Sequence, residues 1–304
     1  MKNSSLIIDT DGGIDDALAV LALVNSKEAD IKLINVTAGN VDNVQAYKNI
    51  SAVLNLCGKK ISLSLGQEAS FSGKLKRPYN VHGSDGLGDT FLSKDIDILN
   101  TLNAPTAFKE AIETGVKKIF SAAPLTNVAD FFLEYPELIS QLEEVWLTGG
   151  VLKSGADMSA EGEFNFYFDP KAVEIVFSAG VEAKVVTMDV TKSVLFGRDF
   201  IKNFEGRKEK TFEFISRILN FSYEFNCNNK GLNGAHLPDL VSACIFLDKN
   251  LADFEKVKVV VGKNTGCLFK NQGGKDILTA CNLKEKQIKE KALDILLGLK
   301  GREV

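Results

Sequence analysis

Short apolar runs alternate with longer stretches along the first part of the chain. Residues 6–8, 31–38 and 61–65 are apolar runs that are too short for helices, and we predict that they form buried parallel strands. Residues 17–24, which are rich in Ala and Leu, and residues 43–56 are predicted helices. This alternation favours an α/β fold with a doubly wound, mostly parallel sheet flanked by helices.

The remainder of the chain carries the same two kinds of segment. Further strands are predicted at residues 117–122, 145–148 and 184–188, with two or three more after residue 254. Helices are predicted from residue 128, from Pro170, over 200–225, over 240–246 and at the end of the chain. Loops are predicted over 66–90, 151–168 and 227–234, the last as a candidate lid. No repeat or linker divides the chain, so we predict a single domain over residues 1–304.

The composition narrows the class of protein. The chain has 304 residues, of which 45% are hydrophobic and 25% charged, so it is long enough to bury a sizeable core. A net charge of −4 does not favour binding to nucleic acid. The sequence shows no signal peptide and no apolar run long enough to span a membrane. The five cysteines form no C-x-x-C pair, and we expect reduced thiols in a cytoplasmic protein. Two histidines are too few for a histidine-rich zinc site.

Four carboxylates lie together at the predicted carboxyl end of the first strand. They are Asp9, Asp11, Asp15 and Asp16, and Gly12 and Gly13 turn the chain into the following helix. In open α/β sheets ligands bind at this edge. Two like charges ~4 Å apart repel by roughly 4 kcal/mol at an effective dielectric near 20, so the acids separate into water, keep protons or surround a cation. Oxygen ligands of this kind suit Ca²⁺ or Mg²⁺.

The segment D-T-D-G-G-I-D-D-A-L-A at residues 9–19 resembles the N-terminal signature of the nucleoside hydrolases, which are Ca²⁺-dependent N-ribohydrolases. Further segments resemble that family in the same order along the chain, and the resemblance runs from Leu6 to about Phe246. They are G-N at 39–40, H-G-S-D-G-L-G at 82–88, P-L-T-N at 124–127, E-F-N at 163–165 and D-L-V-S-A at 239–243.

The resemblance implies a Ca²⁺ site. Asp11, Asp16 and Asp239 would bind the ion together with the backbone carbonyl of Thr126, and Asp11 would also take a proton from the attacking water. Read without the resemblance, Thr126 and Asp239 are helix-capping residues.

The resemblance also implies a ribose site. Asp15 would bind the 2′-hydroxyl, and Asn40, Asp157, Glu163 and Asn165 would line the rest of the sugar. Asp157 stands where the family usually has Asn, so the chain departs from the pattern there. Without the resemblance Asn40 is an ordinary turn residue.

A leaving base needs a proton or a strong hydrogen bond, which histidine usually supplies. Many nucleoside hydrolases place a histidine directly before the last metal-binding aspartate, but this chain has Pro238 there. We predict that His82, in the H-G-x-D-G segment, is a better candidate for the acid than His236. A third outcome, in which neither histidine serves, also stays open.

The resemblance therefore implies an enzyme that hydrolyses a small-molecule ribonucleoside to free base and ribose, acts in nucleoside salvage and forms a homo-oligomer, a dimer or tetramer. Two other classes of protein remain as alternative predictions. D-x-D-G also opens haloacid-dehalogenase-like Mg²⁺ phosphatases, in which Asp9 would be the nucleophile. A non-catalytic nucleoside or sugar sensor on the same fold is the third class.

Overall fold

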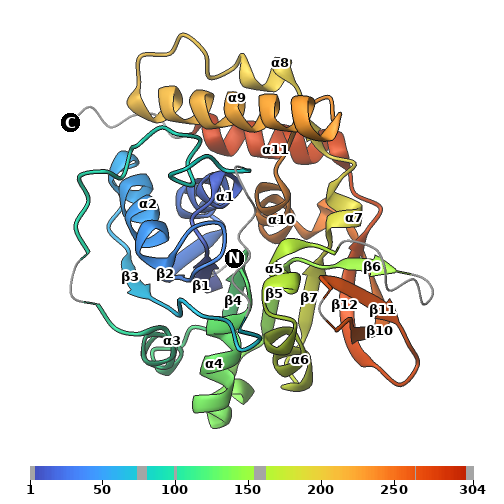
Figure 1. Cartoon of the computed structure of the whole chain (residues 1–304). Coiled ribbons are helices and arrows are strands. Elements are labelled where there is room, and N and C mark those ends of the chain that lie inside the picture. The colour runs from blue at the N-terminus through green and yellow to red at the C-terminus, as the bar shows by residue number, and fades with distance from the viewer. Residues whose placement is uncertain (1–3, 74–80, 99–100, 154–161, 264, 299–304) are drawn as a thin grey trace.

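A ten-stranded sheet forms the centre of the computed structural model, which describes residues 4–73, 81–98, 101–153, 162–263 and 265–298 (Figure 1). Its strands lie in the order β3-β2-β1-β4-β5-β7-β12-β10-β11-β6. The strands are β1 (Ser4–Thr10), β2 (Ala29–Val36), β3 (Ser62–Leu65), β4 (Lys118–Ser121), β5 (Glu144–Thr148), β6 (Val151–Lys153), β7 (Ala183–Val186), β10 (Asp253–Val261), β11 (Cys267–Lys270) and β12 (Lys275–Cys281). The predicted strands before residue 190 and the strands expected after residue 254 are thereby confirmed.

The first seven strands of this order are parallel, as predicted, and the chain winds outward from β1 in two directions. β1 pairs in parallel with β2 on one side and with β4 on the other, so the topological switch point lies between β1 and β4. Parallel pairing continues through β5, β7 and β12. β10 is antiparallel to both of its neighbours, β11 and β12. Ligands of doubly wound sheets bind at the carboxyl ends of the strands beside such a switch point.

Helices cover both faces of the sheet (Figure 1). One core lies between the sheet and helices α1 (Ile14–Asn25), α2 (Asn43–Leu56), α9 (Lys210–Lys230), α10 (Pro238–Leu247) and α11 (Glu285–Leu297). The opposite core lies under α3 (Ala104–Glu113), α4 (Thr126–Glu134) and α6 (Pro170–Ser178). Every residue of α1 from Ile14 to Val24 is buried, which explains why its sequence after Asp16 is apolar on all sides.

Several predictions of loops and helix limits were wrong. Residues 200–225 do not form one helix, because a short helix, α8 (Arg198–Ile201), and α9 are separated by residues 202–209. The aromatic spacing that suggested one helix comes from packing, since the rings of Phe200 and Phe212 both lie near that of Phe204, at centroid distances of 5.6 and 6.1 Å. α9 also continues to Lys230, so the predicted lid loop is helical over residues 227–230.

The other correction concerns the segment predicted as a polar loop over 151–168. It contains β6 and a short helix, α5 (Phe164–Phe168), which Glu163 caps. The remaining elements are α7 (Met188–Thr191), the antiparallel pair β8 (Leu195–Phe196) and β9 (Ala235–His236), and the 3-10 helices η1 (Pro136–Gln141) and η2 (Lys249–Leu251). Among the described residues, no helix combines the length and apolarity needed to cross a bilayer.

An ion cluster around the buried carboxylate of Glu144 joins three strands at the edge of the sheet opposite the carboxyl ends. The carboxylate of Glu144, at the start of β5, contacts Lys118 at 3.0 Å, Lys249 at 3.2 Å and also Lys184. Burial alone would raise the pKa of Glu144, but hydrogen bonds from Lys184 and Lys118, together with the charge of Lys249, outweigh it and lower that pKa to about 2. The charged carboxylate therefore stabilises the folded chain.

We expect Glu144→Gln to lower the free energy of unfolding by about 1–3 kcal/mol at pH 7, because Lys118 and Lys249 lose their counter-charge and Lys184 keeps only that of Glu182. The pKa of Glu144 falls from an ordinary value of 4.5 to about 2 on folding, so its contribution is complete above pH 4.5 and is lost as the pH falls toward 2. Urea unfolding at pH 7 and pH 3 should show a smaller difference between wild type and variant at the lower pH. Glu290→Gln is the matched control, since its side chain is 59% exposed and its pair with Lys286 is 3.8 Å long.

Candidate active site

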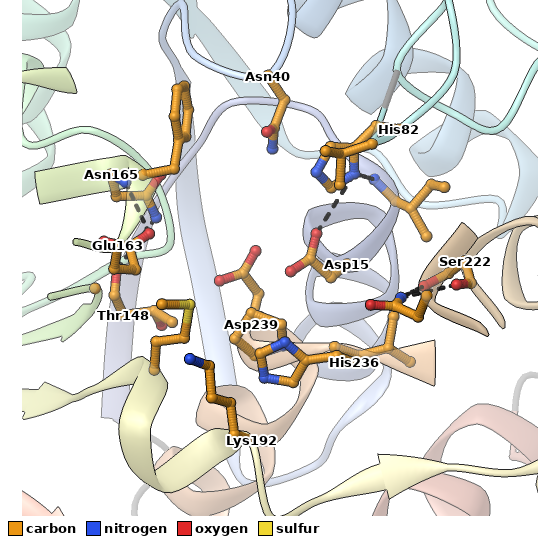
Figure 2. A pocket seen from close by; sticks show the side chains of 18 of the residues that line it. Asp15, Asn40, His82, Thr148, Glu163, Asn165, Lys192, Ser222, His236 and Asp239 are labelled. Atoms are coloured by element: carbon orange, nitrogen blue, oxygen red, sulfur yellow. Dashed lines mark hydrogen bonds and ion pairs between the residues drawn. The ribbon is translucent and has the colours of Figure 1, made fainter. Parts of the chain in front are cut away.

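A cavity of about 610 Å³ opens at the carboxyl ends of the strands, beside the switch point. Its volume is in the range of small-molecule sites. Figure 2 shows polar side chains from distant segments converging on it. The structure brings seven of the predicted site residues to its wall: Asp15, Asn40, His82, Glu163, Asn165, His236 and Asp239.

Carboxylates form the floor of this cavity. One oxygen of each of Asp15, Asp16 and Asp239 lies within 4.8 Å of the others, and all three residues are buried. Asp16 also caps α1, because its carboxylate accepts hydrogen bonds from the backbone N–H groups of Gly13 at 3.0 Å and Asp11 at 3.1 Å. The aspartates therefore meet because β1 ends where α1 begins and because α10 starts directly beside them.

Burial and mutual repulsion make the charged forms of these aspartates unfavourable, and their pKa values are raised. Burial raises the pKa of Asp11 and of Asp239 well above the ordinary value, and the neighbouring carboxylates raise both further. Burial also raises the pKa of Asp15 and of Asp16. One oxygen of Asp15 is buried without a hydrogen-bond partner among the described residues. A cluster of buried carboxylates with an unpartnered oxygen fits a metal ion, which would supply the missing positive charge.

Asp11 lies against the turn that follows β2. The backbone N–H of Asn40 donates to one oxygen of Asp11 at 2.9 Å, and the Asn40 side chain donates to the other at 2.8 Å. Gly39 makes this approach possible, because a Cβ atom there would lie 2.0 Å from an oxygen of Asp11. Asn40 also donates to Asp16 at 3.2 Å, so it connects two of the predicted metal ligands.

The other four predicted site residues are absent from the described lining of the cavity. Thr126 is buried at the start of α4, and its hydroxyl donates to Asp169 at 2.9 Å. Asp157 lies outside the described residues. Asp11 and Asp16 are buried beneath the lining of the cavity.

Glu163 and Asn165 form the wall beside β5. The carboxylate of Glu163 accepts hydrogen bonds from the backbone N–H groups of Gly150 at 2.8 Å, Asn165 at 2.7 Å and Phe166 at 3.1 Å. These bonds lower the pKa of Glu163, but burial dominates and raises it. The side chain of Asn165 donates to the carbonyl of Thr148 at 3.2 Å, so both sugar-site candidates are fixed by backbone contacts.

The ring of His82 faces the N-terminus of α1. Its Nδ1 accepts a hydrogen bond from the backbone N–H of Ile14 at 3.0 Å and lies 3.7 Å from Asp15. A nitrogen that accepts a hydrogen bond carries no proton, so the proton of the neutral ring is on Nε2. Burial lowers the pKa of His82 to about 4, which keeps the imidazole neutral at pH 7.

His236 lies across the cavity from His82 and Asn40 (Figure 2). Its Nε2 is 3.1 Å from the hydroxyl of Thr191, and that hydroxyl donates to the carbonyl of Met188 at 3.3 Å. This contact engages Nε2 of His236 with a side chain of the fold. Burial, followed by the charges of Lys230 and Lys192, lowers the pKa of His236 to about 4, so this ring is also neutral at pH 7.

Asn49 is a supporting residue that the sequence did not reveal. It is fully buried on α2, and its amide donates to the carbonyls of Gly12 at 3.0 Å and Asp85 at 2.7 Å. It thereby joins the aspartate loop to the loop that carries His82. Lys192, Ser222, Asn226 and Lys230 also line the cavity without having been predicted, because no motif marks them.

Asp9 does not have the environment of a phosphatase nucleophile. It is fully buried, and its two oxygens accept hydrogen bonds from Ser121 at 3.0 Å and Asn127 at 2.9 Å. Burial raises the pKa of Asp9 to about 7, which makes the free carboxylate scarcer at neutral pH. Asp9 is also absent from the described lining of the cavity. The haloacid-dehalogenase-like alternative is therefore not supported.

The fold and the cavity define an α/β protein with an acidic, metal-compatible pocket at its switch point. A model of the inosine-uridine preferring nucleoside hydrolases matches residues 6–295, and the chain belongs to that family. The nucleoside hydrolase expected from the sequence is thereby confirmed.

Relatives and solved structures agree with this assignment. Uridine nucleosidase 1 of Arabidopsis thaliana is 28% identical over 271 residues, covering 88% of this chain and 81% of the relative. The pyrimidine-specific ribonucleoside hydrolase RihA of Escherichia coli (strain K12) is 28% identical over 264 residues, covering 86% and 84%. Among solved structures, the plant nucleoside hydrolase PpNRh1 matches with a TM-score of 0.88 and 24% identity over 97% of this chain and 99% of that one. A purine-preferring ribonucleoside hydrolase from Gardnerella vaginalis has a TM-score of 0.86 and 22% identity, with the same coverage.

We expect Gly39→Ala to lower kcat/KM for riboside hydrolysis by about 100-fold, because the new methyl group displaces the carboxylate of Asp11. The melting temperature should stay close to that of wild type, so that the loss of activity does not come from unfolding. Gly197→Ala is the matched control, since its φ is −82° and no atom lies within 4 Å of its added Cβ. Equal activity of the two variants would contradict the assigned role of the Gly39 turn.

Proposed function

We propose that the chain is a Ca²⁺-dependent hydrolase of the N-glycosidic bond of ribonucleosides. The observation that carries this proposal is the group of buried carboxylates at the floor of a nucleoside-sized cavity, in which one oxygen of Asp15 has no hydrogen-bond partner among the described residues. A ribosyl transition state resembles an oxocarbenium ion, and carboxylates around the sugar stabilise its positive charge.

Asp11, Asp16, Asp239 and the carbonyl of Thr126 are the proposed Ca²⁺ ligands. Bound Ca²⁺ would lower the pKa of a coordinated water and orient the ribose hydroxyls. Asp15 belongs to the same close group of oxygens as Asp16 and Asp239, which supports a position for Asp15 between the ion and the sugar. Hard oxygen ligands without nitrogen or sulfur favour calcium over zinc.

Side chains of the protein carry out the proton transfer and bind the ribose and the base. Asp11 takes the proton of the attacking water, and Asp15 accepts a hydrogen bond from the 2′-hydroxyl. Asn40, Asp157, Glu163 and Asn165 hold the rest of the ribose. His82 donates from Nε2 toward the base, whereas Nε2 of His236 is already in contact with the hydroxyl of Thr191. The hydrogen bonds therefore favour His82 over His236 as the histidine that serves the leaving group.

We further propose a cytoplasmic homo-oligomer that acts in nucleoside salvage. The free cysteines at positions 57, 227, 244 and 281 support a reducing compartment. The proposal of a homo-oligomer is based on the family resemblance alone.

The proposal is tested by measuring reducing-sugar release from uridine, inosine and 2′-deoxyuridine, with and without a chelator. We expect ribonucleosides to be cleaved ~10⁴-fold faster than the deoxy analogue, because Asp15 is built to pair with a hydroxyl. Chelation should abolish turnover, and added Ca²⁺ should restore it. Equal rates on uridine and 2′-deoxyuridine would contradict the role of Asp15. Binding of uridine without turnover would instead support the non-catalytic sensor.

A further inference from the structure

The loop that carries His82 is organised around a carboxylate that takes no part in the function proposed above. Asp85 is 7% exposed and is absent from the described lining of the cavity. Its carboxylate accepts hydrogen bonds from the backbone N–H groups of Leu87 at 2.8 Å, Asp89 at 2.9 Å and Phe91 at 2.6 Å. One buried side chain therefore fixes the backbone of its own loop at three places.

The backbone of this loop, residues 82–91, has a conformation that side chains disfavour. Asp89 and Phe91 have positive φ angles of 56° and 52°. The ring of Phe91 is 55% exposed, so burial of that ring does not hold the backbone in place. A hydrogen bond from a backbone N–H to a carboxylate is stronger than one to a neutral acceptor. The bonds from Asp89 and Phe91 to Asp85 therefore offset the unfavourable φ angles.

The same loop is joined to His82 and to the start of α1. The backbone N–H of Gly88 donates to the carbonyl of His82 at 2.8 Å, which closes the chain between these two residues. The backbone carbonyl of Asp85 accepts a hydrogen bond from Asn49, which also donates to the carbonyl of Gly12. Asp85 thus lies within the closed turn that begins at His82, and Asn49 connects that turn to the residues before α1.

The position of the His82 ring depends on where this loop places it. Its Nδ1 accepts the backbone N–H of Ile14 at 3.0 Å and lies 3.7 Å from Asp15, as the dashed lines in Figure 2 show. This arrangement leaves Nε2 as the ring atom that can donate to a leaving group. Displacement of a catalytic group by about 1 Å can lower a rate about 100-fold. A loop that moved would therefore cost activity without any change in His82 itself.

We propose that Asp85 is the positioning residue for His82: its carboxylate holds the loop closed, and the closed loop directs Nε2 of His82 toward the leaving group. Asp85 does not contact the substrate and transfers no proton. Loss of its carboxylate releases the loop but keeps the bond from Asn49 to the backbone carbonyl, so the aspartate floor stays in place. This inference rests on the role of His82 in the function proposed above.

A double-mutant cycle separates the positioning of His82 from general support of the fold. It compares kcat/KM of wild type, Asp85→Ala, His82→Ala and the double variant on uridine and on p-nitrophenyl riboside, whose leaving group needs no proton. We expect Asp85→Ala to lose about 100-fold on uridine and less than about threefold on p-nitrophenyl riboside. On uridine the double variant should match His82→Ala within about twofold, because a histidine that is absent cannot be misplaced.

Two further variants control for the chemistry of the substitution. Asp85→Asn keeps one acceptor oxygen and should recover part of the activity on uridine that Asp85→Ala loses. Asp248→Ala is the matched control, because the carboxylate of Asp248 also accepts a backbone N–H within its own turn, that of Asn250 at 3.0 Å. Asp248 is absent from the described lining of the cavity, so its loss should leave both substrates unaffected.

Hydrogen exchange supplies a readout that does not depend on activity. The N–H of Ile14 donates to His82, so its exchange should be at least about tenfold faster in both Asp85→Ala and His82→Ala than in wild type. The amide of Leu21, in the middle of α1, should keep its wild-type rate in both variants. A merely structural role for Asp85 would not single out Ile14.

Losses on uridine that multiply in the double variant, or equal losses of Asp85→Ala on the two substrates, would overturn the inference. Unchanged exchange at Ile14 in Asp85→Ala would overturn it as well. If wild type is active and His82→Ala loses nothing, the role of His82 and this inference both fall, whereas hydrolysis stands. If wild type cleaves no riboside, the proposed function falls, and exchange at Ile14 still decides whether Asp85 holds His82 in place.

Discussion

Mutual repulsion among buried carboxylates is the constraint on which the site depends. Oxygens of Asp15, Asp16 and Asp239 lie within 4.8 Å of one another, and Asp11 adjoins Asp16. At such distances each pair of charges costs roughly 4 kcal/mol at an effective dielectric near 20. The N-terminus of α1 offsets only ~0.3–1 kcal/mol for each acid. A divalent cation removes the conflict that hydrogen bonds alone leave in place.

The scaffold holds this unfavourable arrangement by burying everything around it. α1 is buried along nearly its whole length, so the aspartates at its start cannot move out into solvent. Gly39 allows the next turn to contact Asp11, and Asn49 ties the aspartate loop to the loop of His82. The ion cluster around Glu144 secures β4, β5 and β7 at the opposite edge, away from the pocket.

Local sequence predicted the parts of the site that local geometry builds. Asp15 and Asp16 follow from the end of β1 and the start of α1, and the strand pattern places Asn40 and the acids at one edge. Asn49 was missed because its contacts are long-range. Asn226 and Lys230 were missed because no motif marks them and only the fold brings their helix to the cavity. The break between α8 and α9 was missed because Phe200, Phe204 and Phe212 pack together across it, which imitates one continuous helical face. The small helix α5 was missed because its cap, Glu163, was interpreted only as a ligand residue.

Calorimetric titration of Ca²⁺ into the chelator-treated chain at pH 7 tests the central claim most directly. The account predicts one ion bound per chain in wild type and in Asp15→Asn, because Asp15 serves the sugar. Asp16→Asn should bind at least about tenfold more weakly, since it removes a ligand charge and one of the two oxygens that accept hydrogen bonds at the start of α1. A wild-type chain that binds no Ca²⁺, or an Asp16→Asn chain that binds it as tightly as wild type, would contradict the account.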